Sequence, residues 1–225
     1  MIASYLFPIM AVGLGILMGY LTQNSKKRAT KLLLSFSGAF LLALTLFDLL
    51  PGVYEKLEAK KTGLFIMCGI LLQVIMEFFS KGAEHGHVHI NRYRSNFPWL
   101  LFVSLCVHSF LEGFPIHDHH DMVYGVLVHK IPIAALITTF LLKSNFSKKQ
   151  IVFFLFVFAF MTPLGTLTSD VSDFTTNTIN LINALVIGIF LHISTTILFE
   201  AGEGHKFNLS KLIVIILGIG VAYVI

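Results

Sequence analysis

The sequence has few charged residues for its length. Asp, Glu, Lys and Arg together make up 12% of its 225 residues, whereas about 25% is usual in a soluble domain. Hydrophobic residues make up 56%, and the mean hydropathy is +0.82. This composition excludes a soluble globular protein and indicates an integral membrane protein.

The sequence also lacks several motifs that would define an enzyme or a redox protein. Its two cysteines, Cys68 and Cys106, lie in apolar stretches and form neither a CxxC site nor a disulfide framework, so we interpret them as small buried apolar residues. No G-x-x-x-x-G-K-[ST] motif is present, which excludes a P-loop ATPase, and no H-E-x-x-H motif is present either.

Long apolar stretches are what the sequence does contain. A helix needs roughly 17 to 25 residues to cross the hydrocarbon core of a membrane. Stretches of this kind fill most of residues 1–225, which predicts one all-α transmembrane domain, an eight-helix bundle, without a soluble domain. The eight stretches lie near residues 2–22, 32–53, 63–80, 97–116, 122–142, 151–168, 178–199 and 209–225.

The basic residues predict the orientation of this bundle. Most of them fall in the connections after the first, third, fifth and seventh stretches, so the positive-inside rule predicts that these connections are cytoplasmic and that both termini are outside. The net charge of +4 therefore reflects topology and gives no reason to expect nucleic acid as a partner. The basic residues of these connections are Lys26, Lys27, Arg28, Lys31, Lys81, Arg92, Arg94, Lys143, Lys148, Lys149, Lys206 and Lys211; the other connections hold Lys56, Lys60 and Lys61.

Ionisable residues interrupt the fourth and fifth stretches, where a charge is costly. His108 and Glu112 are four residues apart, which places them about 40° apart around a helix axis and about 6 Å along it. His129 lies in the next stretch. Pro115 and Pro132 each follow an ionisable residue by three positions and are expected to break both helices there. Broken helices near the middle of a membrane are typical of a transporter's binding site.

Two imidazoles and one carboxylate suit zinc and other divalent transition metals, such as Fe(II), Mn(II) or Co(II). The alternative is that these side chains only join neighbouring helices by hydrogen bonds. A His and a Glu on one helix face, beside a second His and two prolines, favour the metal. We therefore predict that His108, Glu112 and His129 bind a metal ion.

The same residues resemble a known family. HSFLEG, beginning at His108, and HKIP, beginning at His129, are similar to the paired motifs of the ZIP (Zrt-/Irt-like) family of divalent-metal transporters, and TPLG, from Thr162, and FLHISTTILFE, from Phe190, are similar to its later helices. The resemblance implies eight helices in a 3+2+3 arrangement, both termini outside, and an elevator-like motion. It also implies transport of Zn(II) or a related divalent ion toward the cytoplasm, through a site between the fourth and fifth helices. The metal would be the transported substrate, and neither a cofactor nor catalysis is expected.

Some positions depart from the family pattern. Many members build two adjacent metal sites with an Asn, the residue after the second His and a Glu, where this chain has Ser109, Lys130 and Ile133. Ile133 cannot bind a metal, and Lys130 puts an ammonium where a second cation would lie. We therefore expect one metal site, with Lys130 as the counter-charge of Glu112. Asp48, in FDLLP, matches a position where many members have His, and it is a candidate for the transport path, as are Ser109, Lys130 and His117.

Other groups are weaker candidates. His192 is expected either on the transport path or in helix packing, and Glu77 falls near a helix end, where we expect water. Two His-containing connections could bind metal weakly, although each could equally be a solvated polar segment. They are HDHHD, with His117, His119 and His120, in the outer connection after the fourth stretch, and EHGHVH, with His85, His87 and His89, in the cytoplasmic loop of about residues 81–96.

Two other functions remain open at this point. An intramembrane zinc hydrolase would use His108, His129 and His192 as ligands, with Asp48 or Glu112 as general base. A non-transporting metal sensor would be favoured by the departures from the family pattern.

The location and partners follow from the same observations. The sequence shows no organelle signal and the chain is small, so we expect a multi-pass protein of a bacterial plasma membrane. Its expected partners are a divalent metal ion and the lipid bilayer, and a homodimer is an option that the sequence leaves open.

Overall fold

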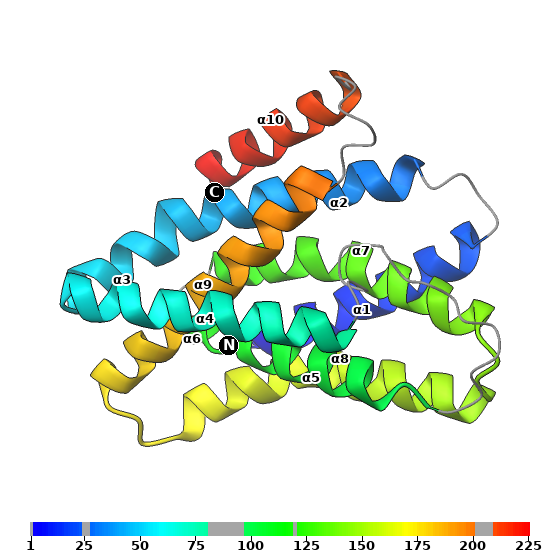
Figure 1. Cartoon of the computed structure of the whole chain (residues 1–225), viewed down its shortest axis with the longest axis horizontal. Coiled ribbons are helices and arrows are strands. Elements are labelled where there is room, and N and C mark those ends of the chain that lie inside the picture. The colour runs from blue at the N-terminus through cyan, green and yellow to red at the C-terminus, as the bar shows by residue number, and fades with distance from the viewer. Residues whose placement is uncertain (1, 24–27, 81–96, 119–120, 201–208) are drawn as a thin grey trace.

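The computed structural model describes residues 2–23, 28–80, 97–118, 121–200 and 209–225 (Figure 1). Within these residues, every regular element is a helix. In chain order, the elements are α1 (Ile2–Thr22), α2 (Arg28–Leu44), the π-helix η1 (Thr45–Leu49), α3 (Leu50–Lys56), α4 (Ala59–Ser80), α5 (Trp99–Leu111), α6 (Pro115–Asp118), α7 (Met122–Lys143), α8 (Lys148–Val171), α9 (Thr176–Glu200) and α10 (Leu209–Val224).

The lengths of these helices agree with the eight predicted stretches. Six helical runs in the described residues are long and apolar enough to cross a membrane, and one of them joins α2, η1 and α3 into a single span, Ala29–Lys56. Two shorter apolar helices, α5 and α10, correspond to the fourth and eighth stretches. The prediction of an all-α membrane bundle is confirmed.

The surface of the bundle is apolar, and many polar side chains lie inside. Large apolar side chains are exposed on all sides of the bundle, where lipid would cover them, while buried Ser, Thr, Asn and His side chains face other helices. Exposed examples on four helices are Leu14, Met67, Phe78, Phe156 and Ile216.

Both ends of the described chain lie on the same side of the bundle. Figure 1 shows the N and C marks toward the left, where the α3–α4 and α8–α9 turns also lie, while the α7–α8 connection lies at the right. This is the arrangement that an even number of crossings requires.

The helices divide into two groups by their contacts. In the first group, α7 packs on α1 and α8, and α5 packs on α8. In the second group, α9 packs on α4 and α2, and α10 packs on α2. The groups meet where α7 lies on α2 and where α5 lies on α4.

Glycines bring helices into backbone contact inside each group. A Cβ atom added to Gly165 of α8 would lie 1.9 Å from the Phe110 carbonyl oxygen of α5. In the second group, a Cβ atom on Gly188 of α9 would lie 2.0 Å from the Ile66 carbonyl oxygen of α4. No side chain fits at either crossing, so these helix pairs are held at the closest distance that the backbone permits.

The contact between the two groups is of a different kind. The atoms nearest to a Cβ on Gly125 of α7 are side-chain methyl groups, beginning with Leu44 Cδ1 at 3.1 Å. Between α5 and α4, the Ser104 hydroxyl donates a hydrogen bond to the Met76 carbonyl at 2.8 Å. At Gly125 the groups therefore meet through flexible side chains, in contrast to the locked backbones inside each group.

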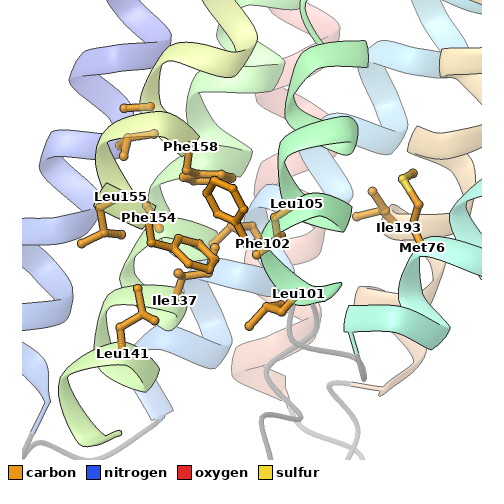
Figure 2. Close-up of a cluster of buried hydrophobic side chains, with 14 of the residues drawn as sticks. Met76, Leu101, Phe102, Leu105, Ile137, Leu141, Phe154, Leu155, Phe158 and Ile193 are labelled. Atoms are coloured by element: carbon orange, nitrogen blue, oxygen red, sulfur yellow. The ribbon is translucent and has the colours of Figure 1, made fainter. Parts of the chain in front are cut away.

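An apolar cluster fills one half of the first group and reaches into the second (Figure 2). Its members on α5 and α7 lie between the ionisable residues His108 and His129 and the end of the bundle that holds the α7–α8 connection, and its members on α8 lie in the first half of that helix. Phe102 and Phe154 pack edge to face there, with ring centroids 5.1 Å apart. Labelled members in Figure 2 include Met76, Leu101, Leu105, Ile137, Leu141, Leu155, Phe158 and Ile193.

Candidate metal centre

Three predicted metal ligands come together between α5 and α7. His108 lies on α5, Glu112 is its C-terminal cap residue and His129 lies on α7. Each offers one ligand atom, and these atoms all lie within 4.8 Å of one another. All three residues are at most 3% exposed. The structure therefore joins two helices at one buried group of metal-binding atoms.

The distances suit a metal ion after a small adjustment. His108 Nε2 lies 2.6 Å from Glu112 Oε1, and His129 Nε2 lies 4.0 Å from the same oxygen. Two ligands on a tetrahedral zinc ion, each about 2.1 Å from it, lie roughly 3.4 Å apart. An ion would thus replace the His108–Glu112 hydrogen bond and move the ligand atoms by about 1 Å or less.

Lys130 occupies the other side of the carboxylate. Its Nζ atom lies 2.6 Å from Glu112 Oε2 and 3.1 Å from Ser109 Oγ, and it lies 4.9 Å from the ring centre of Phe158. Lys130 itself is 1% exposed. The predicted pairing of Lys130 with Glu112 is therefore present in the structure, and one carboxylate oxygen faces the imidazoles while the other faces the ammonium.

The break at the end of α5 positions Glu112. The helix ends at Leu111, as the spacing to Pro115 predicted, and Gly113 N–H donates to Phe110 O instead of continuing the α-helical pattern to Ser109.

Two threonines of α8 satisfy the carbonyl groups at this break. The Thr162 hydroxyl donates to the Ser109 carbonyl at 2.8 Å, and the Thr166 hydroxyl donates to the Gly113 carbonyl at 3.0 Å. Thr162 and Gly165 both belong to the TPLG motif. The motif therefore holds the broken end of α5 and fixes the residue that carries the carboxylate.

The second predicted break is absent. α7 continues as an α-helix from Met122 to Lys143 with Pro132 inside it, so the predicted break at this proline is absent, while a kink there stays a prediction. The helix lies against α1, where a Cβ on Gly15 would come within 2.6 Å of the Ile131 carbonyl oxygen. Close packing on α1 supports α7 on both sides of the proline.

His192 lies outside this group and has a partner of its own. Its Nε2 atom lies 2.7 Å from Glu77 Oε2 of α4, and both side chains are partly buried. Glu77 was expected in water at a helix end, and its pairing with His192 was missed by sequence reasoning. The His108, His129 and His192 ligand set of a hydrolase is therefore not assembled in this structure.

The remaining candidates are placed as follows. Asp48 lies in η1 and is partly buried; single π-helical turns often occur at functional sites, and this one was not predicted. His117 lies on α6, but its side chain is outside what the structure describes. The loop candidates also lie outside the described residues: His85, His87, His89, His119 and His120.

A membrane-embedded helical bundle with a buried His/Glu group has the features expected of the class of membrane proteins that bind metal ions. A family model described as "ZIP Zinc transporter" matches residues 83–225. The chain belongs to this family of metal-ion transporters. The search of curated proteins found no match.

Proposed function

We propose that the protein moves Zn(II), or a related divalent transition metal, toward the cytoplasm through a site formed by His108, Glu112 and His129. The observation that supports this most directly is the convergence of three buried ligand atoms from two helices within 4.8 Å. Imidazole and carboxylate ligands suit zinc and its neighbours better than hard cations.

The proposed site binds one ion. The Lys130 ammonium lies 2.6 Å from Glu112 on the side away from the imidazoles, and Ile133, one helical turn beyond His129, is buried and apolar. A second cation next to Lys130 would meet repulsion at short range and would find no ligand on Ile133.

The direction of transport follows from the proposed orientation. The basic connections after α1, α4, α7 and α9 would face the cytoplasm, and both termini would be outside. The membrane would be a bacterial plasma membrane, and the metal ion is the substrate rather than a cofactor.

Further polar residues are proposed to line the route on the cytoplasmic side. Ser104, one turn before His108, donates to the Met76 carbonyl, and the residue after Met76 is Glu77, which pairs with His192. These contacts lead from the metal site toward the end of α4, so His192 and Glu77 would receive an ion released from it. On the outer side, Asp48 and His117 are proposed as further residues of the path.

Metal uptake into vesicles that contain the purified protein tests this function. We expect His108→Ala, Glu112→Ala and His129→Ala each to lower zinc uptake at least ~10-fold, because each removes one of three protein ligands. In metalloproteins, even the loss of a residue that only hydrogen-bonds to a ligand lowers metal affinity or activity about 10- to 100-fold. Ser37→Ala is the matched control: Ser37 is buried, but its hydroxyl bonds only within α2, to the Leu34 carbonyl.

The same experiment separates the alternatives. Metal binding to the parent protein without uptake would indicate a sensor, and normal uptake by all three variants would mean that the ion passes elsewhere.

A further inference from the structure

Asn183 on α9 is a buried amide without a hydrogen-bond partner. Its side chain is fully buried, and neither its oxygen nor its nitrogen finds a partner among the residues that the structure describes. Burying an amide in this way has a desolvation cost that no bond offsets. A leucine has the same branching and the same number of side-chain heavy atoms and would avoid the cost, so the shape of the side chain alone gives no reason for an amide at this position.

The helical spacing shows where Asn183 points. Ile187 and Phe190 follow it by four and seven residues and therefore share its face of α9. Both belong to the apolar cluster that joins α9 to α2, η1 and α7. Asn183 therefore lies on a face of α9 that packs into this cluster, the seam to which both helix groups contribute side chains. Members of this cluster from the other elements include Leu44, Leu49, Met122 and Val126.

The depth of Asn183 follows from the two apolar clusters to which α7 and α9 both contribute side chains. The two helices run in the same direction, because their residues in one cluster, apart from Phe190, come earlier in each helix than their residues in the other. His129 lies between the two sets on α7, whereas Asn183 precedes the first set on α9. Asn183 is therefore roughly 5 to 10 Å nearer the beginning of the helices, the end proposed to face outside. The first set is Met122, Val126, Ala184 and Ile187, and the second is Ile133, Ile137, Ile189 and Ile193.

α9 also packs on η1, the π-helical turn that carries Asp48. An uncharged amide and a carboxylate-bearing turn therefore lie on adjoining elements, on the outer side of the metal site.

We propose that the Asn183 carboxamide is an oxygen ligand for a partly hydrated divalent cation that passes between the outer side and the His108–Glu112–His129 site. This inference rests on the proposed function. The amide oxygen would contact the ion, and the amide N–H groups point away from a cation and would donate to other acceptors along the path. A neutral ligand at this depth holds an ion weakly, so the ion can move on to the charged site, whereas a carboxylate would retain it.

Asn183→Leu tests the proposal through two measurements, one of transport, which should become worse, and one of stability, which should not. In vesicles, we expect the KM for zinc uptake to rise about 10-fold with little change in kcat. Removing a group that supports a metal site typically lowers metal affinity about 10- to 100-fold, and we expect a loss at the low end of this range. In detergent, we expect the temperature of thermal unfolding to stay the same or rise, because the substitution removes an unpaired buried amide. Asn183→Asp should lower both KM and kcat, because a carboxylate would hold the ion longer.

The matched control is Thr138→Val. Thr138 is buried on α7, and its hydroxyl also has no partner among the described residues. It faces α1, where a Cβ on Gly19 would lie 2.9 Å from its own Cβ, and so lies away from the seam. We expect this variant to keep the KM of the parent.

Two results would overturn the proposal. One is an Asn183→Leu protein with the KM of the parent; the other is a lower unfolding temperature or failure to reach the membrane, which would assign Asn183 a structural role. Glu112→Ala, measured in parallel, separates the two levels of inference. If it abolishes uptake while Asn183→Leu has no effect, the proposed function stands and only the role of Asn183 fails.

Discussion

At the scale of single residues, the Lys130–Glu112 pair determines the free-energy cost of the proposed metal site when no ion is bound. An unpaired carboxylate at membrane depth is expensive, and here the ammonium lies 2.6 Å from one of its oxygens. Removing one partner of a buried ion pair typically costs about 3–5 kcal/mol, because the other charge is left uncompensated. Lys130 therefore makes the site tolerable when no metal is bound.

Lys130→Met should make the protein depend on its metal. We expect a lower unfolding temperature without metal, because Glu112 loses its partner, and a larger rise in that temperature on adding zinc than the parent shows. Thermal unfolding in detergent, with and without zinc, measures both effects. Lys143→Met, at an exposed position in the last turn of α7, is the control, and an equal zinc-induced rise in the parent and in Lys130→Met would contradict the argument.

At the scale of elements, the contact between α5 and α8 holds Glu112 in place. A Cβ atom on Gly165 would lie 1.9 Å from the Phe110 carbonyl oxygen, and the next residue of α8, Thr166, bonds to the broken end of α5. The geometry of the proposed metal site therefore depends on a residue that touches none of its proposed ligands.

Gly165→Ala should force the two helices apart. The contact is with backbone, which cannot turn aside, so we expect a loss of about 1–3 kcal/mol in stability, the usual cost of overpacking, and reduced zinc uptake. Gly13→Ala on α1, where an added Cβ meets nothing within 4 Å, should leave uptake unchanged. A Gly165→Ala protein as stable and as active as Gly13→Ala would show that the crossing is not tight.

The same elements show what the sequence could predict. The length and apolarity of the stretches predicted the crossings, and the i, i+4 spacing of His108 and Glu112 put both on one face of α5. The partner of His192 could not be predicted, because a contact between α4 and α9 joins residues that are 115 positions apart in the chain.

Two local features were also beyond the sequence. Pro132 does not interrupt α7 because packing on a neighbouring helix overrides a local preference, and the π-helical turn at Asp48 has no simple residue pattern.

At the scale of the whole molecule, the two helix groups differ in how they can move. Backbone contacts at glycines tie helices together inside each group, whereas α7 meets α2 through flexible side chains at Gly125. The elevator-like motion that the ZIP resemblance implies needs this combination, in which each group stays rigid while one slides along the other.

The charge of the site then has an electrical consequence. With neutral imidazoles, the Lys130–Glu112 pair leaves the empty site with no net charge, and one bound divalent ion gives it a charge of about +2. Moving two charges across a membrane potential of 100 mV is worth about 4.6 kcal/mol, so a potential that is negative inside would drive the loaded step and leave the return of the empty site unaffected.

We expect zinc uptake into vesicles to rise when a potassium diffusion potential makes their interior negative. Lys130→Met should respond less to the potential on the loaded step and should be helped by it on the return, because its empty site carries a negative charge that an inside-negative potential drives outward. Uptake by the parent protein that does not change with the potential would contradict this account. A single lysine would thus place the whole effect of the membrane voltage on the step that carries the metal.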